Sequence, residues 1–129
     1  MNHSANDYSP GDIAELYSDA TIAERIKAAQ KRVNLDDSEM KEIVVQYIQD
    51  TPAMFENLNQ AWQRNDHDAM MLYAHSIVGV ARLLKLNEVG SYAKAVEDRA
   101  RERLQPDEDT LILLNEHHNA SMAALRKLY

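Results

Sequence analysis

Hydrophobic side chains recur every three or four residues along most of the chain, which is the spacing that one face of an α-helix requires. The longest such run lies between residues 36 and 64. Asp36 and Glu39 form a capping-box pattern at its start. Pro52 interrupts the run, but the apolar positions stay in phase on both sides of it. The pattern therefore predicts a single kinked helix that ends near Arg64.

Further helical patterns precede and follow this run. The segment before it begins near Asp12 and has a stop signal at Asn34, and its pattern fits either one helix or two. Three segments follow the run: residues 67–85, residues 87–104 with Asn87 as the cap, and a last helix with Pro106 in its first turn.

No segment alternates with the period of a β-strand for long. The sequence therefore predicts an all-α fold, an up-and-down four-helix bundle with an additional N-terminal helix. Residues 1–11 are polar and end in Ser9-Pro10-Gly11, so we expect them to form a flexible arm. At roughly 100–200 residues per domain, residues 12–129 are expected to be a single domain.

Composition removes several classes of site. The chain has 129 residues, of which 3 are glycine, 3 are proline and none is cysteine. Disulfides, thiolate nucleophiles and cysteine-ligated metals are therefore excluded. Metal sites in helical bundles use Glu-x-x-His pairs, and this spacing does not occur, so we expect no metal site.

Charge and hydropathy restrict the partners. The formal net charge is -7, which argues against nucleic-acid binding because that depends on clustered Lys and Arg. No apolar run approaches the roughly 20 residues of a membrane-spanning helix, and the N-terminus lacks the features of a secretory signal. Together with the lack of cysteine, these features lead us to expect a cytoplasmic protein with no membrane partner.

The helix predicted over residues 67–85 carries unusual residues on the face opposite its core positions. His75, Gly79 and Arg82 follow one another along that outward face. Large apolar residues flank this line: Met71, Leu72, Val78 and Leu83. A rim of this kind is typical of a protein docking surface, although the N-terminal helix packing over it is an equally good explanation.

The same three residues also predict a chemistry. A histidine in a helix is most often an ordinary surface or core residue, but Gly79 needs a reason, since glycine inside a helix costs about 1 kcal/mol relative to alanine. On an outward face it leaves space beside the imidazole of His75. A neutral imidazole is a nucleophile near neutral pH, and Arg82 adds a positive charge. We predict that His75 accepts a phosphoryl group, that Arg82 stabilises it, and that a partner performs the catalysis.

The stretch from Leu72 to Leu86 resembles the signature of histidine phosphotransfer (HPt) domains. The family pattern is Ala-His-x-Leu-Lys-Gly followed by a small residue, and the matching positions are Ala74, His75, Ile77 and Gly79. The next helix of the family is similar at Leu86, Val89, Ala93, Val96 and Glu97, and the preceding one at residues 47–52, Leu58 and Asp66. The resemblance covers residues 35–103 well and the last helix loosely.

This resemblance implies a phosphorelay intermediate of two-component signal transduction. A receiver-domain aspartate would reversibly donate its phosphoryl group to a ring nitrogen of His75, and Met71, Leu72, Val78, Gly79 and Leu83 would contact the partner. That partner would be a response-regulator receiver domain or a hybrid sensor histidine kinase. Mg²⁺ would belong to the receiver, so this chain needs no cofactor of its own. We expect a monomeric phosphocarrier with no ATPase or autokinase activity.

One position departs from the family pattern. The lysine that is usual three residues after the histidine is Val78 here, and Arg82, one turn further along, is not an equivalent donor. Two alternatives therefore remain open: an HPt-fold adaptor that binds a receiver or kinase without efficient phosphotransfer, and an unrelated helical adaptor. The charged residues from Glu97 to Arg103 are expected to solvate a helix end, and His118 to be partly buried and hydrogen-bonded.

Overall fold

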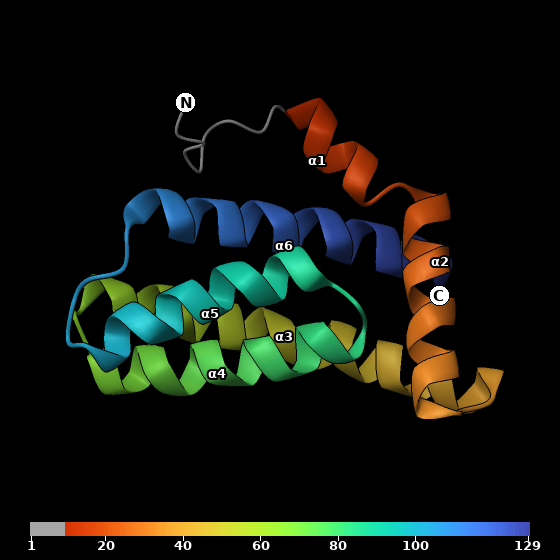
Figure 1. The fold of residues 1–129 in the computed structure, drawn as a ribbon, viewed down its shortest axis with the longest axis horizontal. Coiled ribbons are helices and arrows are strands. Elements are labelled where there is room, and N and C mark those ends of the chain that lie inside the picture. The colour runs from red at the N-terminus through yellow and green to blue at the C-terminus, as the bar shows by residue number, and fades with distance from the viewer. Residues whose placement is uncertain (1–9) are drawn as a thin grey trace.

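The computed structural model describes residues 10–129, with side chains from residue 12 onward, and this part of the chain forms six helices and no strands (Figure 1). The helices are α1 (Pro10–Leu16), α2 (Asp19–Val33), α3 (Asp37–Gln63), α4 (His67–Leu83), α5 (Asn87–Arg101) and α6 (Glu108–Leu128). The predicted all-α class is confirmed.

The last four helices form the bundle. α3 contacts α4, α4 contacts α5, α5 contacts α6, and α6 returns to α3, so helices that follow one another in sequence are neighbours in space. Their buried faces meet in one apolar core, to which α3 contributes Leu58, α4 Ile77, α5 Val96 and α6 Leu114. Within residues 10–129, no helix combines the length and the apolar character needed to cross a membrane.

The longest helix, α3, runs without interruption through Pro52, so the prediction of a single helix is confirmed, and the kink stays a prediction. At its start, Asp36 accepts a hydrogen bond from the backbone N–H of Glu39, and the Glu39 side chain accepts one from the backbone of Asp36. One residue before Pro52, the hydroxyl of Thr51 donates to the backbone carbonyl of Tyr47 at 2.7 Å. This continuous helix packs beside α4.

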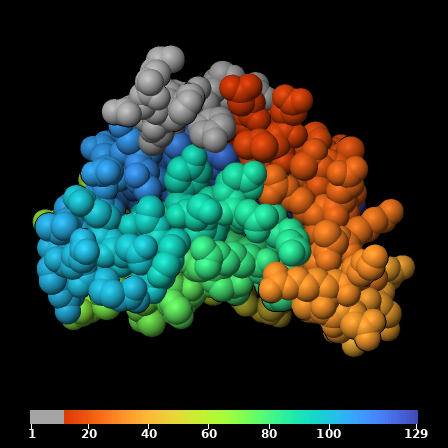
Figure 2. All heavy atoms as spheres, in the orientation of Figure 1, coloured from red at the N-terminus to blue at the C-terminus, as the bar shows by residue number. Residues whose placement is uncertain are grey.

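The N-terminal region forms two helices, which is one of the two possibilities that its sequence pattern leaves open. The chain breaks at Tyr17 and Ser18, and Ser18 caps α2 by accepting from the backbone N–H of Thr21. The first helix begins at Pro10, two residues before the predicted helix start at Asp12, and residues 1–9 lie outside the described part of the chain. α1 contacts α6, whereas α2 crosses one end of the bundle (Figures 1 and 2).

Arg25 of α2 fastens this N-terminal region to the turn between α4 and α5. Its guanidinium donates to both carboxylate oxygens of Glu88, at 2.7 and 3.0 Å, and to the backbone carbonyl of Lys85 at 2.9 Å. A further bond reaches the backbone carbonyl of Leu16, at the end of α1. Bidentate bonds of this kind fix orientation, so α2 holds the turn that sets α5 beside α4.

The predicted starts of α5 and α6 are wrong by one or two residues. Asn87 is the first residue of α5 and not its cap; Leu86 takes the cap position without a side-chain hydrogen bond. Pro106 precedes α6, which begins after Asp107. Both errors are shifts of one or two residues and leave the packing of the helices unchanged.

Candidate functional site

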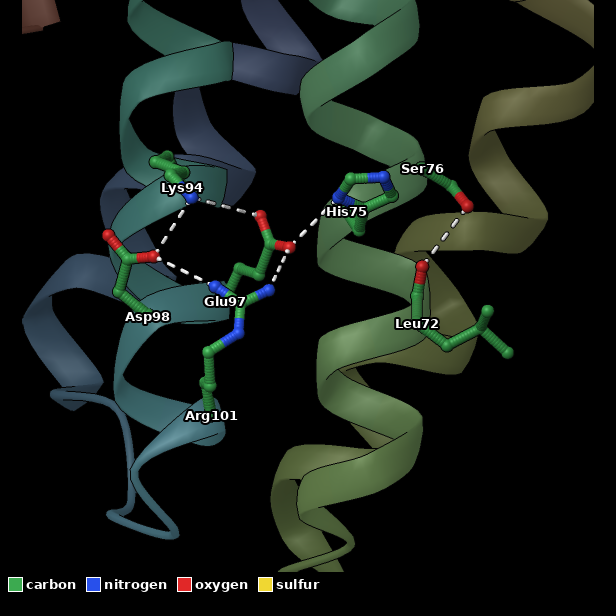
Figure 3. A network of polar contacts seen from close by, with 7 residues as sticks. All are labelled: Leu72, His75, Ser76, Lys94, Glu97, Asp98 and Arg101. Atoms are coloured by element: carbon green, nitrogen blue, oxygen red, sulfur yellow. Dashed lines mark hydrogen bonds and ion pairs between the residues drawn. The ribbon is translucent and has the colours of Figure 1, made fainter.

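His75 lies in the middle of α4 with most of its imidazole in solvent. The side chain is 76% exposed, yet its Nδ1 atom lies 2.9 Å from Oε2 of Glu97 on α5 (Figure 3). Of the four histidines that the structure describes, His75 is the one with an exposed side chain. The imidazole is therefore held at one nitrogen and accessible at the other.

Glu97 is a buried carboxylate and needs partners, because an unpaired charge is costly to remove from water. It is only 2% exposed. Arg101 donates to the same Oε2 atom at 2.9 Å, and the ammonium of Lys94 lies 3.7 Å from Oε1. Asp98 completes the network through Oδ1, which lies 3.0 Å from Lys94 Nζ and 3.6 Å from Arg101 Nη1 (Figure 3). One helix thus supplies the carboxylate and the two cations that balance it.

The contact with Glu97 selects the tautomer of the neutral imidazole. A carboxylate accepts hydrogen bonds but does not donate them, so the proton of neutral His75 lies on Nδ1. The lone pair then lies on Nε2, on the side of the ring away from Glu97 (Figure 3). A second residue orients an imidazole in this way wherever one nitrogen must act as a nucleophile or ligand.

Open space adjoins this ring, as the sequence predicts. Gly79, one turn after His75, is exposed, and a Cβ atom built on it would have no neighbour within 4 Å. The glycine therefore serves no close packing against the residues that the structure describes. Because glycine has no side chain, the outward face of α4 is open beside the imidazole, and another molecule can approach Nε2.

The apolar rim around His75 is only partly as predicted. Leu72 and Leu83 are 62% and 38% exposed, and Met71 is half-buried. Val78 is 7% exposed, so its predicted place on the exposed rim is wrong. The contacts of His75 with Glu97 and of Arg82 with Gly90 place α5 beside this part of α4, and Val78 lies between these two contacts along the helix.

The exposed rim continues into a groove between α3 and α4. Its lining is largely apolar and consists of Ile43, Gln46, Tyr47, Asp50, Thr51, Met54, Val80, Leu83 and Leu84. Leu83 belongs to both the rim and the groove. The surface around Gly79 therefore extends toward α3, on the side of α4 opposite the charged network of α5.

Arg82 shares the outward face of α4 with His75 but packs toward α5. A Cβ atom on Gly90 would lie 3.1 Å from Cγ of Arg82, so the stem of the arginine lies across this glycine. Seven residues of helix separate it from His75, a rise of about 10 Å. Its role as a phosphate-stabilising cation remains a prediction, and the cations linked to His75 through Glu97 are Lys94 and Arg101.

Sequence reasoning missed this part of the site. The charged residues from Glu97 to Arg103 were expected to solvate a helix end, but Glu97 is buried against α4. Two signals were available in the sequence. Glu97 follows the buried stripe position Val96, and Lys94 and Arg101 are spaced three and four residues from it, which places all three on one side of a helix.

Two histidines of α6, His117 and His118, are buried and face the core. His117 Nδ1 lies 2.8 Å from the hydroxyl of Tyr17, and burial lowers the pKa of His117. His118 stacks on Phe55 with ring centroids 3.7 Å apart, and burial lowers the pKa of His118 to about 4. Its Nδ1 has no hydrogen-bond partner within the described residues, so the expected hydrogen bond is lacking at that atom.

Comparison with protein families gives a match to the Hpt domain over residues 42–127. The chain belongs to the Hpt domain family. The match begins near the start of α3 and ends at the end of α6, so the bundle is the Hpt domain and both α1 and α2 precede the matched region. No curated protein and no solved structure gave a match.

Family membership gives the site its context. Hpt domains take part in two-component phosphorelays, where they function with response-regulator receivers and kinases. The exposed histidine of α4 and the open space at Gly79 belong to the matched region of this Hpt domain. Within the described residues, no cluster of three or more His, Asp or Glu side chains is arranged to hold a metal ion.

Proposed function

We propose that this Hpt domain is a phosphorelay intermediate that accepts a phosphoryl group on Nε2 of His75 and passes it to a receiver. The contact between His75 Nδ1 and Glu97 is the observation that carries the proposal. It leaves the lone pair of Nε2 in solvent on the open side of α4. An exposed histidine with no such partner would be an ordinary surface residue.

The transfer needs no catalytic group from this chain beyond the nucleophile and its orienting carboxylate. The Nε2 lone pair attacks the phosphorus of an aspartyl phosphate on a receiver, the N–P bond forms, and the P–O bond to the aspartyl carboxylate breaks. The electron pair of that bond stays with the carboxylate. The imidazole ring becomes positively charged, with its proton still on Nδ1, and the buried carboxylate of Glu97 stabilises this charge. The reverse sequence returns the phosphoryl group to a receiver.

The receiver is expected to dock over the exposed face of α4. Leu72, Gly79 and Leu83 offer an apolar surface around the imidazole, and Met71 contributes at its edge. Mg²⁺ is assigned to the receiver, and neither ATP hydrolysis nor autophosphorylation is expected of this chain. We further propose that the protein is a monomer in the cytoplasm.

The test is incubation with a receiver domain phosphorylated on its aspartate. Wild-type protein should acquire acid-labile phosphate, and His75→Gln should acquire none. His67→Gln is a matched control, because it also removes a histidine of α4 but lies two turns away. Labelling of His75→Gln to the wild-type level would contradict the assignment.

A second candidate is an Hpt adaptor that binds a receiver without efficient transfer. The observation that favours it is Val78, which is buried where the family pattern has a lysine. In that case the wild-type protein would bind a phosphorylated receiver, for example in a titration by calorimetry, and would remain unlabelled. Binding together with labelling would exclude it.

A further inference from the structure

We propose that Lys94 of α5 binds the phosphoryl group on His75, in place of the lysine that Val78 has replaced. This inference rests on the proposed function, since it concerns the phosphorylated state of the same histidine. It assigns the missing positive charge to a neighbouring helix, whereas the sequence pattern alone directed attention to Arg82 on α4.

The register of the two helices is the first argument. His75 contacts Glu97, and Arg82, seven residues further along α4, lies across Gly90, seven residues earlier on α5. The helices therefore run antiparallel in constant register between these two contacts. Three residues beyond His75 on α4 is Val78, and three residues before Glu97 on α5 is Lys94. Lys94 thus lies level with the position from which the usual lysine would reach the phosphoryl group.

The freedom of the Lys94 side chain is the second argument. It is 42% exposed, and its two partners are Asp98, at 3.0 Å, and Glu97, at 3.7 Å. The contact between Lys94 and Glu97, at 3.7 Å, is an ion pair without a hydrogen bond. Ion pairs at this degree of exposure are weak, and the four-carbon stem of lysine has many rotamers. The ammonium can therefore leave Asp98 for a phosphoryl group, which carries nearly two negative charges near neutral pH.

Arg101 is not equivalent to Lys94. Its guanidinium lies 2.9 Å from Glu97 Oε2, the oxygen that also binds His75, and 3.6 Å from Asp98. It lies four residues after Glu97, on the side away from Gly79. The partner would approach at Gly79. We assign it the positioning role of holding Glu97, which leaves Lys94 as the cation on the Gly79 side.

The experiment measures how fast phosphohistidine hydrolyses in protein loaded with phosphoramidate, a small donor that needs no receiver. Lys94→Ala should shorten the lifetime by about twofold to fivefold, the loss expected for one partly exposed charge contact. Lys94→Arg should retain most of it. Lys41→Ala, which removes an exposed lysine from α3, is the matched control and should behave as wild type.

Two further variants separate phosphoryl binding from a structural role. Asp98→Ala removes the closest partner of Lys94; if the lysine only stabilised α5 through that ion pair, this variant would shorten the lifetime as Lys94→Ala does. The proposal predicts a lifetime equal to or longer than wild type. Adding Val78→Lys to Lys94→Ala should restore the lifetime, since a lysine stem can follow the apolar surface to reach solvent.

The outcomes also separate this inference from the proposed function. If His75 takes no phosphate from phosphoramidate or from a phosphorylated receiver, the proposed function fails and the inference fails with it. If His75 is phosphorylated but Lys94→Ala hydrolyses at the wild-type rate, the inference alone is wrong. A lifetime in Asp98→Ala as short as that in Lys94→Ala would also overturn it.

Discussion

Glu97 is the residue through which the structure makes its most specific prediction. The carboxylate is 2% exposed and lies 2.9 Å from Nδ1 of His75. Replacement by alanine removes the acceptor, so the neutral imidazole is free to carry its proton on Nε2, where it blocks attack. Replacement by glutamine keeps the shape but lets the amide present either its oxygen or its NH₂ group to the ring. Both changes are expected to slow phosphoryl uptake by His75.

The size of the effect follows from the type of contact. A hydrogen bond to a charged group is worth about 1.5–3 kcal/mol, and each 1.4 kcal/mol corresponds to about a factor of ten in rate. Loss of the bond in Glu97→Ala should therefore slow uptake by about ten- to a hundredfold. Glu97→Gln should fall nearer the lower end, because part of its population still accepts from Nδ1.

Uptake from phosphoramidate, followed by intact mass, is the suitable assay because it reports the imidazole without a docking step. Glu102→Gln is the matched control, since Glu102 is an exposed glutamate at the C-terminal end of the same helix. The cations that pair with Glu97 are 42% exposed in Lys94 and 54% exposed in Arg101, so water solvates them when the carboxylate becomes an amide, and unfolding should not account for the loss in Glu97→Gln. Uptake within twofold of wild type in both Glu97 variants would refute the reasoning.

Two further predictions concern Gly79 and His118. Gly79→Ala should raise the free energy of unfolding by up to about 1 kcal/mol in a urea titration, because a Cβ there meets none of the described residues within 4 Å. Gly79→Leu should weaken receiver binding without loss of helicity, and unchanged binding would remove Gly79 from the docking surface. Burial lowers the pKa of His118 to about 4, below the value of about 6.5 in the unfolded chain, so the residue is neutral in the fold. Its contribution to stability is therefore fully present above pH 6.5 and is lost as the pH falls toward 4. Urea titrations should show this loss as about 2 kcal/mol between pH 7 and pH 5, and His118→Leu should reduce the difference by that amount; an equal pH dependence in this variant would contradict the assignment.

Local sequence patterns were sufficient to predict the features that depend on one helix alone. The capping box at Asp36, the continuous helix through Pro52 and the left-handed stop at Asn34 depend on residues a few positions apart, and all are found in the structure. The outward position of His75 and Gly79 follows in the same way from the period of α4.

The wrong predictions concern residues whose burial or contacts depend on how two helices pack together. Val78 is buried because α5 lies beside it, and the periodicity of α4 alone does not tell on which side its neighbour packs. Glu97 and Lys94 are 22 and 19 residues after His75, and only the pairing of α4 with α5 brings them to it. The break after α1 also depends on a long-range contact, the bond from Tyr17 to His117, in addition to the local cap at Ser18.

The central claim is that His75 accepts a phosphoryl group on Nε2 while Glu97 holds the proton on Nδ1. The most direct measurement is a long-range ¹H–¹⁵N correlation spectrum of the histidine rings in ¹⁵N-labelled protein, recorded before and after loading with phosphoramidate. The account predicts that neutral His75 is protonated on Nδ1 and that phosphorus then couples to its Nε2. A neutral ring protonated on Nε2, or phosphorus bound to Nδ1 or to another histidine, would contradict it.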